Sequence, residues 1–405
     1  MNTSKKIKDF LFHSPNKPFV WVFLSLLLGG LIGSASALFL FVLEYVTTVR
    51  QANPIFLFGL PIGGFFIGCL YYYFGGNANK GNNLLIQEYH HPVAKIPFKM
   101  APFVLVGTWV THLFGGSAGR EGTAVQMGGA IADQFTKLFK LEAKDRQAML
   151  LMGIAGGFAS VFGTPLAGTV FALELMVVGR NKYTYILPLL LTSIVSHYIC
   201  LTWGITHTVY TVDWVPALAL YPLFKVSIAG VLFGLTAILF VKSTDTVSHL
   251  ATKYISYPPL RPFFGGILFL LLFYLIQEPR LLGLGVETIV DSFHSSQPYT
   301  LFLLKIAFTA LTLGAGFKGG EVTPLFFIGA TFGSFLALYL QLPIGFMASL
   351  GFVAVFAGAT KTPLACIFMA TELFGSETLI YTALCCLIAY FISGKHSIYK
   401  FQLYL

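Results

Sequence analysis

The stretch Gly115–Ala130 places an arginine and a glutamate, Arg120 and Glu121, among small residues inside very apolar sequence. A single ionised side chain at the centre of a bilayer costs roughly 2.5 to 3.5 kcal/mol even on lenient insertion scales, so it usually faces a protein interior or a water-filled path. Glu121 is therefore the first functional candidate. A purely structural ion pair with Arg120 is the alternative.

Three glycine-containing breaks in apolar sequence are expected to begin helices. They are Gly81-Asn82-Asn83, Gly119-Arg120-Glu121-Gly122 and Gly319-Gly320-Glu321-Val322-Thr323-Pro324. The start of a helix presents unpaired N–H groups and about half a positive charge, so several such ends can replace the hydration of an anion. With the polar carboxyl-terminal end around Tyr399, they predict a binding site for a small anion. For the first break alone, an ordinary loop and helix cap is the alternative.

A glutamate beside an anion site has a specific use. As a carboxylate, Glu121 can occupy the anion position itself. When protonated, it loses that attraction and can swing out, which links anion movement to proton movement. Two further glutamates, Glu174 and Glu372, are expected near helix ends, where we predict that they cap or pair structurally.

The composition is that of a polytopic membrane protein. Of 405 residues, 56% are hydrophobic and 10% are charged, whereas soluble domains average about 25% charged residues. Apolar runs between Phe19 and Ile392 leave room for about ten or more spans of about 20 residues. The first run, Phe19–Val42, is too long for a signal-peptide core. We expect a retained helix in the cell's inner or plasma membrane, with residues 1–17 in the cytoplasm.

Other function classes fit the sequence less well. The net charge of +9 does not indicate a nucleic-acid partner, because lysines and arginines are scattered between apolar runs as in positive-inside loops. Five cysteines without a CxxC pair predict free thiols, and no motif indicates a metal or a cofactor. An intramembrane enzyme using Glu121 or Ser117 is the alternative from another class, but no base or second carboxylate lies at a suitable spacing.

The second half of the chain repeats the first. Thr164-Pro-Leu-Ala with Glu174 recurs 198 residues later as Thr362-Pro-Leu-Ala with Glu372, and the Glu121 stretch recurs 200 residues later at Glu321. Chance similarity among apolar segments is the alternative, but two separate motifs agree on nearly one offset. Repeats with interrupted segments in corresponding positions favour a transporter whose site lies where half-helix ends meet.

These observations predict an all-α integral membrane protein with short and broken helices. We expect a first repeat over residues 18–210 and a second over residues 211–405, which ends in a carboxyl-terminal helix. No soluble regulatory domain is expected.

The motifs Gly119-Arg-Glu-Gly, Gly320-Glu-Val-Thr-Pro and Gly394-Lys-His-Ser-Ile-Tyr resemble the three signatures of the CLC chloride channel and transporter family. The resemblance covers essentially the whole membrane chain and looks strongest to the bacterial fluoride/proton antiporter branch. It implies a homodimer with one anion pathway per subunit, and two inverted repeats of short, tilted helices.

Carried over by position, Glu121 matches the gating glutamate of the family, and Tyr399 matches the tyrosine that closes the inner side of the anion site. Three positions depart from chloride-selective members: Asn82 replaces a serine, Val322 replaces a phenylalanine, and Leu175 stands where exchangers have an inner proton-accepting glutamate.

These departures argue for fluoride. Fluoride is smaller and more strongly hydrated than chloride, and the amide of Asn82 supplies two donors where serine supplies one. Thr323 offers another hydroxyl, and in the fluoride branch the glutamate matching Glu321 is also implicated in transport. The resemblance therefore implies a fluoride/proton antiporter that exports fluoride, with a chloride channel or chloride/proton exchanger as the alternative.

Overall fold

The computed structural model describes residues 18–92, 95–139, 141–178 and 185–404, so the predicted cytoplasmic segment 1–17 lies outside the described residues. The described chain is almost entirely helical, which confirms the all-α prediction. The only sheet among the described residues joins two-residue strands, β1 (Val177–Val178) and β2 (Leu403–Tyr404), in parallel.

The helices divide into two series of similar order. The first series is α2 (Pro18–Ala52), α3 (Leu60–Cys69), α4 (Asn82–His90), α5 (Met100–Leu113), α6 (Glu121–Leu138), α7 (Ala143–Phe162), α8 (Pro165–Met176) and α9 (Ile186–Thr202). The second is α10 (Leu220–Tyr254), α11 (Leu260–Ile276), α12 (Val286–His294), α13 (Tyr299–Gly314), α14 (Val322–Leu340), α15 (Ile344–Thr360), α16 (Pro363–Phe374) and α17 (Leu379–Ile392). Short 3₁₀-helices lie at Pro54–Gly59, Gly76–Lys80, Pro279–Leu281 and Ser376–Thr378, and a short π-helix lies at Leu70–Gly75.

Length alone would underestimate the number of membrane segments. In the described part of the chain, four helical stretches are long and apolar enough to cross a bilayer: Phe19–Ala52, Pro54–His90, Leu220–Tyr254 and Val322–Leu340. Eight more apolar helices have 10 to 17 residues. Helices this short leave backbone ends at membrane depth, where they must be buried in protein or line a cavity.

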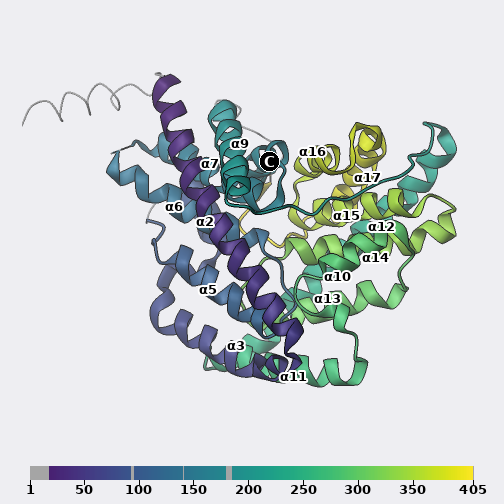
Figure 1. Cartoon of the computed structure of the whole chain (residues 1–405), viewed down its shortest axis with the longest axis horizontal. Coiled ribbons are helices and arrows are strands. Elements are labelled where there is room, and N and C mark those ends of the chain that lie inside the picture. The colour runs from purple at the N-terminus through teal and green to yellow at the C-terminus, as the bar shows by residue number, and fades with distance from the viewer. Residues whose placement is uncertain (1–17, 93–94, 140, 179–184, 405) are drawn as a thin grey trace, which may run out of the picture.

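The same packing recurs in each series. Gly29 and Gly33 of α2 leave no room for side chains against Val195 and Ile199 of α9. In the second series, Gly230 and Gly234 of α10 meet Ile388 and Ile392 of α17 in the same way. Small residues spaced by four allow close contact between membrane helices. In Figure 1 the first series (purple to blue-teal) and the second (teal-green to yellow) lie side by side.

The two series also contact each other reciprocally. Gly266 of α11 packs against Pro61 of α3, and Gly64 of α3 packs against Pro262 of α11, so these helices lie together at one edge of the molecule (Figure 1). Two copies of one unit that are related by a two-fold rotation exchange contacts in this way. The predicted inverted repeats would therefore make such contacts.

Carboxylates exchanged between the repeats cap two further helices. Glu372 of α16 accepts the backbone N–H groups of Leu166 and Ala167, both at 2.8 Å, at the start of α8. Glu174 of α8 accepts those of Leu364 and Ala365, at 3.1 and 2.7 Å, at the start of α16. The predicted structural capping role of both glutamates is confirmed, but each caps the helix of the other repeat.

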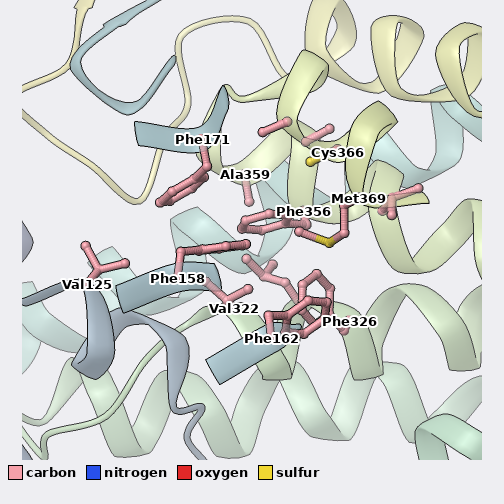
Figure 2. Close-up of a cluster of buried hydrophobic side chains, with 14 of the residues drawn as sticks. Val125, Phe158, Phe162, Phe171, Val322, Phe326, Phe356, Ala359, Cys366 and Met369 are labelled. Carbon is pink, nitrogen blue, oxygen red and sulfur yellow. The ribbon is translucent and has the colours of Figure 1, made fainter. Parts of the chain in front are cut away.

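An apolar cluster fills the space between the repeats. Figure 2 shows Phe158 and Phe162 of α7 meeting Val322 and Phe326 of α14, with Phe356 of α15 beside them. The rings of Phe162 and Phe326 lie 4.9 Å apart. This cluster fixes the position of α14, whose first turn belongs to the candidate site.

The chain does not stop at its last described helix. α17 ends at Ile392, and the residues beyond it bring Tyr399 inward before β2 pairs with β1 at the end of α8. This non-helical return was not predicted, because two residue pairs of strand leave too short a signal in sequence. Four of the five cysteines are buried and Cys69 is half-buried; all are free thiols.

We expect Gly329→Ala to destabilise the protein, because a methyl group at Gly329 of α14 would meet the backbone of Gly351 in α15. Overpacking of this kind costs roughly 1 to 3 kcal/mol. The measurement is the midpoint of thermal unfolding in detergent. Gly30→Ala is the matched control, since nothing lies within 4 Å of a methyl group there, and an equal midpoint in both variants would contradict the close crossing.

Candidate functional site

A polar cavity of about 180 Å³ lies where the predicted helix breaks meet. Its walls include Gly81, Asn82 and Asn83 at the start of α4, Gln126 of α6, Lys318 and Glu321 before α14, and Tyr399 from the end of the chain. Segments far apart in sequence thus contribute polar groups to one small space inside an apolar protein.

The start of α4 is shaped by a glycine. Gly81 has a φ of +58°, a conformation that side chains disfavour, and it is followed directly by Asn82 and Asn83. The side-chain oxygens Oδ1 of both asparagines are buried and have no hydrogen-bond partner among the described residues. Buried polar atoms are normally paired with protein, water or ligand, so these amides mark the cavity as a place for a polar guest.

Buried ion pairs hold α4 in place. Arg146 of α7 binds Asp133 of α6 (Nε to Oδ1, 2.6 Å) and Glu88 of α4 (Nη1 to Oε2, 3.2 Å). Breaking one partner of a buried pair is strongly destabilising. The network therefore fixes the asparagines at the start of α4 relative to α6.

Glu121 begins α6 and is completely buried. Its carboxylate accepts hydrogen bonds from Thr323 at the start of α14: the hydroxyl lies 2.8 Å from Oε1 and 2.7 Å from Oε2, and the backbone N–H lies 3.1 Å from Oε2. Arg120 contributes a backbone N–H at 3.3 Å, while its guanidinium Nε is 3.6 Å away. The Glu121 carboxylate therefore accepts hydrogen bonds from groups at the start of α14, and the ion pair with Arg120 is only one of its contacts.

The two breaks are locked together by backbone. The N–H of Gly119 donates to the carbonyl of Gly320 at 2.6 Å, and the N–H of Gly320 donates to that of Gly119 at 2.8 Å. Gly122 follows in the first turn of α6, and a Cβ there would lie 3.4 Å from Nδ2 of Asn82 and 3.5 Å from Oε2 of Glu321. A missing side chain thus keeps open the space between the first asparagine and the second glutamate.

Two lysines, Lys80 and Lys318, line this cavity, and sequence reasoning assigned neither to the site. The ammonium of Lys318 is 3.3 Å from Oδ1 of Asn79 and 4.1 Å above the ring centre of Tyr71. It is close enough to Glu321 for an electrostatic interaction. Tyr399, which is 4% exposed, interacts electrostatically with both Glu121 and Glu321. The available signal was a lone lysine three residues before Glu321 in apolar sequence.

The structure divides the predicted site residues into two groups. Those that line the cavity are Gly81, Asn82, Asn83, Glu321 and Tyr399. Those that lie outside its lining are Gly119, Arg120, Glu121, Gly122, Val322 and Thr323. Val322 differs most from expectation, because its side chain belongs to the apolar cluster (Figure 2). Gln126 and Asn79 line the cavity without having been predicted.

The inverted repeats and the convergent helix starts define a membrane ion-transport protein. Residues 63–394 match the profile of the voltage gated chloride channel family, and the chain therefore belongs to this family. The "Chloride/fluoride channel protein" of Pseudomonas syringae pv. tomato is 47% identical over 388 residues, which cover 94% of this chain and 86% of the relative. The "H(+)/Cl(-) exchange transporter ClcA" of Vibrio vulnificus is 28% identical, over 97% of this chain and 91% of the relative.

Solved structures agree with this assignment. The crystal structure of a CLC-type fluoride/proton antiporter superposes with a TM-score of 0.93 at 35% identity, covering 96% of this chain and all of the other. A slow cyanobacterial Cl⁻/H⁺ antiporter superposes with a TM-score of 0.79 at 19% identity, covering 92% of this chain and 94% of the other, and this second likeness shows the fold alone.

Thr323→Val should lower the unfolding midpoint through the loss of its bonds to Glu121, since a hydrogen bond to a charged group contributes roughly 1.5 to 3 kcal/mol. In a Glu121→Gln background, Thr323→Val should lower the unfolding midpoint by less. A double-mutant cycle of the four unfolding midpoints therefore measures the coupling between Thr323 and Glu121. Thr331→Val, which removes a buried hydroxyl bonded within α14, is the control. Strict additivity of the two changes would argue against the contact.

Proposed function

We propose that the protein is a fluoride/proton antiporter that exports fluoride in exchange for protons. The exchange moves negative charge outward and positive charge inward, so an inward proton gradient drives it. Support comes from the relative named a chloride/fluoride channel protein at 47% identity and from the likeness to a fluoride/proton antiporter. In this proposal the chain is a transporter, and an intramembrane enzyme is the less supported alternative.

The observation that carries the proposal is the position of the Glu121 carboxylate on the hydroxyl and N–H of Thr323. A carboxylate that accepts from a helix start stands where an anion would bind. Protonation cancels its charge and weakens its hold on these donors. The freed donors can then bind an anion, while the protonated side chain carries its proton away, so the two movements are linked.

The cavity chemistry favours fluoride over chloride. A small, strongly hydrated anion must find many strong donors when it leaves water, and bonds to a charged partner contribute roughly 1.5 to 3 kcal/mol each. In this proposal Asn82 and Asn83 supply amide donors, the N–H groups after Gly81 supply more, and Lys318 adds a positive charge at the wall.

Glu321 is the proposed second protonatable group. It lines the cavity, and its Oε2 lies 3.5 Å from the point that a Cβ on Gly122 would occupy, next to Asn82. In this proposal a proton that leaves Glu121 toward the cavity passes to the Glu321 carboxylate. The inner glutamate that other exchangers have where this chain has Leu175 is then not needed. Tyr399 closes the same cavity from the end of the chain.

The proposed assembly is a homodimer in the cell's inner or plasma membrane, with one anion pathway in each subunit and a cytoplasmic amino terminus. Each subunit has its repeats over 18–210 and 211–405. The complete cavity within a single chain supports one pathway per subunit.

Proteoliposomes loaded with fluoride should release it while external pH rises, because each proton taken up leaves the outer medium. A fluoride electrode and a pH electrode read both fluxes together. Glu121→Gln should abolish proton uptake, while Glu377→Gln, at an exposed position, should not. Faster release of chloride than of fluoride would favour the chloride channel or exchanger instead, and wild-type proton uptake in Glu121→Gln would remove Glu121 from the mechanism.

Asn82→Ser should reduce the preference for fluoride over chloride by about tenfold, because one donor fewer removes about 1.5 kcal/mol. The measurement is the ratio of the two efflux rates. Asn53→Ser, at a position whose side chain is bonded only to Val49 among the described residues, is the control. An unchanged ratio of efflux rates would show that residues other than Asn82 determine the selectivity.

A further inference from the structure

Seven buried side-chain polar atoms have no hydrogen-bond partner within the part of the chain that the structure describes. Two belong to Asn82 and Asn83 in the anion cavity, and one belongs to Arg50. The remaining four are Nε of Arg120, Oγ1 of Thr164, Nδ1 of His197 and Nε2 of His207. The anion cavity accounts for none of these four, since none of their residues lines it.

The four residues belong to one region. The imidazole rings of His197, on α9, and His207, in the segment after α9, stack with centres 5.3 Å apart and planes inclined by 20°. The ring of His207 also packs on Gly163, whose φ of +83° ends α7 immediately before Thr164. Both histidines are only partly buried, so the pair connects the protein surface with unpaired polar atoms inside.

Arg120 connects this pair with Glu121. Arg120 lies close enough to His207 for an electrostatic interaction, and its Nε is 3.6 Å from Oε1 of Glu121. The side chain of Tyr210 interacts electrostatically with both Arg120 and Glu121. Arg120 is therefore near both the histidine pair and the carboxylate, and it does not line the cavity.

We propose that His197 and His207 form a proton relay between water and Glu121. The inference rests on the proposed fluoride/proton exchange and adds a route for the proton to it. Unpaired, buried polar atoms that cluster are suited to hold ordered water, and water can bridge His207 to the carboxylate.

The relay needs no other reactant than water and the proton itself. A hydronium ion gives its proton to one imidazole, forming an N–H bond. This imidazolium passes a proton through bridging water to the second imidazole, which breaks an N–H bond on the first ring and forms one on the second. The second ring then gives its other proton to Glu121 through bridging water, which breaks that N–H bond and forms an O–H bond on the carboxylate. Both rings end neutral, and the steps reverse when Glu121 releases its proton to this side. Burial lowers the pKa of His207 to about 4, with further lowering by His197 and Arg120, so the ring is neutral at rest. A neutral imidazole carries one donor and one acceptor nitrogen, so it can accept a proton on one side and give one up on the other.

The charged and titratable groups around the pair come from every neighbouring element. The arginine before α6 is the nearest cation, and Glu121 lies behind it. The ring of Tyr198 meets that of His197 edge-on within α9, and Cys200 on the same helix interacts electrostatically with Arg120. Tyr210 completes the set from the segment after α9. None of these neighbours combines a donor nitrogen with an acceptor nitrogen in one ring, so the histidines are the groups suited to pass a proton on.

The test measures proton uptake and fluoride efflux together in proteoliposomes of His197→Ala, His207→Ala and the wild type across pH. We expect each variant to transport both ions at least about tenfold more slowly at alkaline pH, because a positioned acid–base group contributes about 10²-fold or more. The deficit should shrink at acidic pH, where free hydronium protonates Glu121 directly. Added imidazole should restore the rate, and the ratio of protons to fluoride should stay unchanged.

Two control variants accompany the histidine substitutions. His249→Ala, at an exposed position on α10, should match the wild type. If His207→Ala fails to fold, as judged by its unfolding midpoint, His207→Gln keeps a side chain against Gly163 but cannot relay protons, and it should show the same alkaline deficit.

Three results would overturn the relay. The first is wild-type transport by both histidine variants at every pH. The second is a weaker apparent affinity for fluoride with an unchanged pH profile, which would make the cluster an anion site. The third is a wild-type protein that moves fluoride without protons, which would also remove the proposed exchange, whereas the first two results leave that exchange intact.

Discussion

The buried carboxylate of Glu121 is stabilised chiefly by Thr323 of the other repeat, whose hydroxyl and backbone N–H both donate to it. A carboxylate without partners in an apolar interior would cost many kcal/mol or would become protonated. Its partner lies on α14, so α6 and α14 must begin within hydrogen-bond distance of each other. The backbone bridge between Gly119 and Gly320 enforces that distance, and the exchanged contacts of α3 with α11 and of α8 with α16 follow from the same two-fold relation.

At the start of α14 the surroundings change from polar to apolar between two consecutive residues. Thr323 turns its hydroxyl to Glu121, while the neighbouring Val322 lies among phenylalanines (Figure 2). Close-packed aromatic rings resist displacement, so the apolar cluster that surrounds Val322 holds the first turn of α14 rigid. The donors that face Glu121 are thereby preorganised, and a side chain or an ion must adapt to them. On the other face, the cavity at Asn82 and Glu321 offers polar walls with unpaired atoms.

Much of this arrangement was predictable because charge is so rare in the sequence. A glutamate between glycines in apolar surroundings identified Glu121, and the recurrence of Thr-Pro-Leu-Ala identified the repeats and the paired roles of Glu174 and Glu372. The exchange of those caps between repeats was not predictable, since spacing along one chain does not say which helix end lies nearby. Lys318 and the stacked histidines were missed for a related reason: single polar residues near breaks gain meaning only from neighbours that folding supplies.

The caps supplied by Glu174 and Glu372 also limit where an ion can rest. A bare helix start at membrane depth is an electrostatic well for any anion, and a well beside the route would hold ions that never complete the crossing. At α8 and α16 the protein fills these wells permanently with carboxylates of its own. These two helix starts are thus not available to bind a transported anion. Because each repeat fills the well of the other, neither half of the chain alone would offer an ion an unobstructed path.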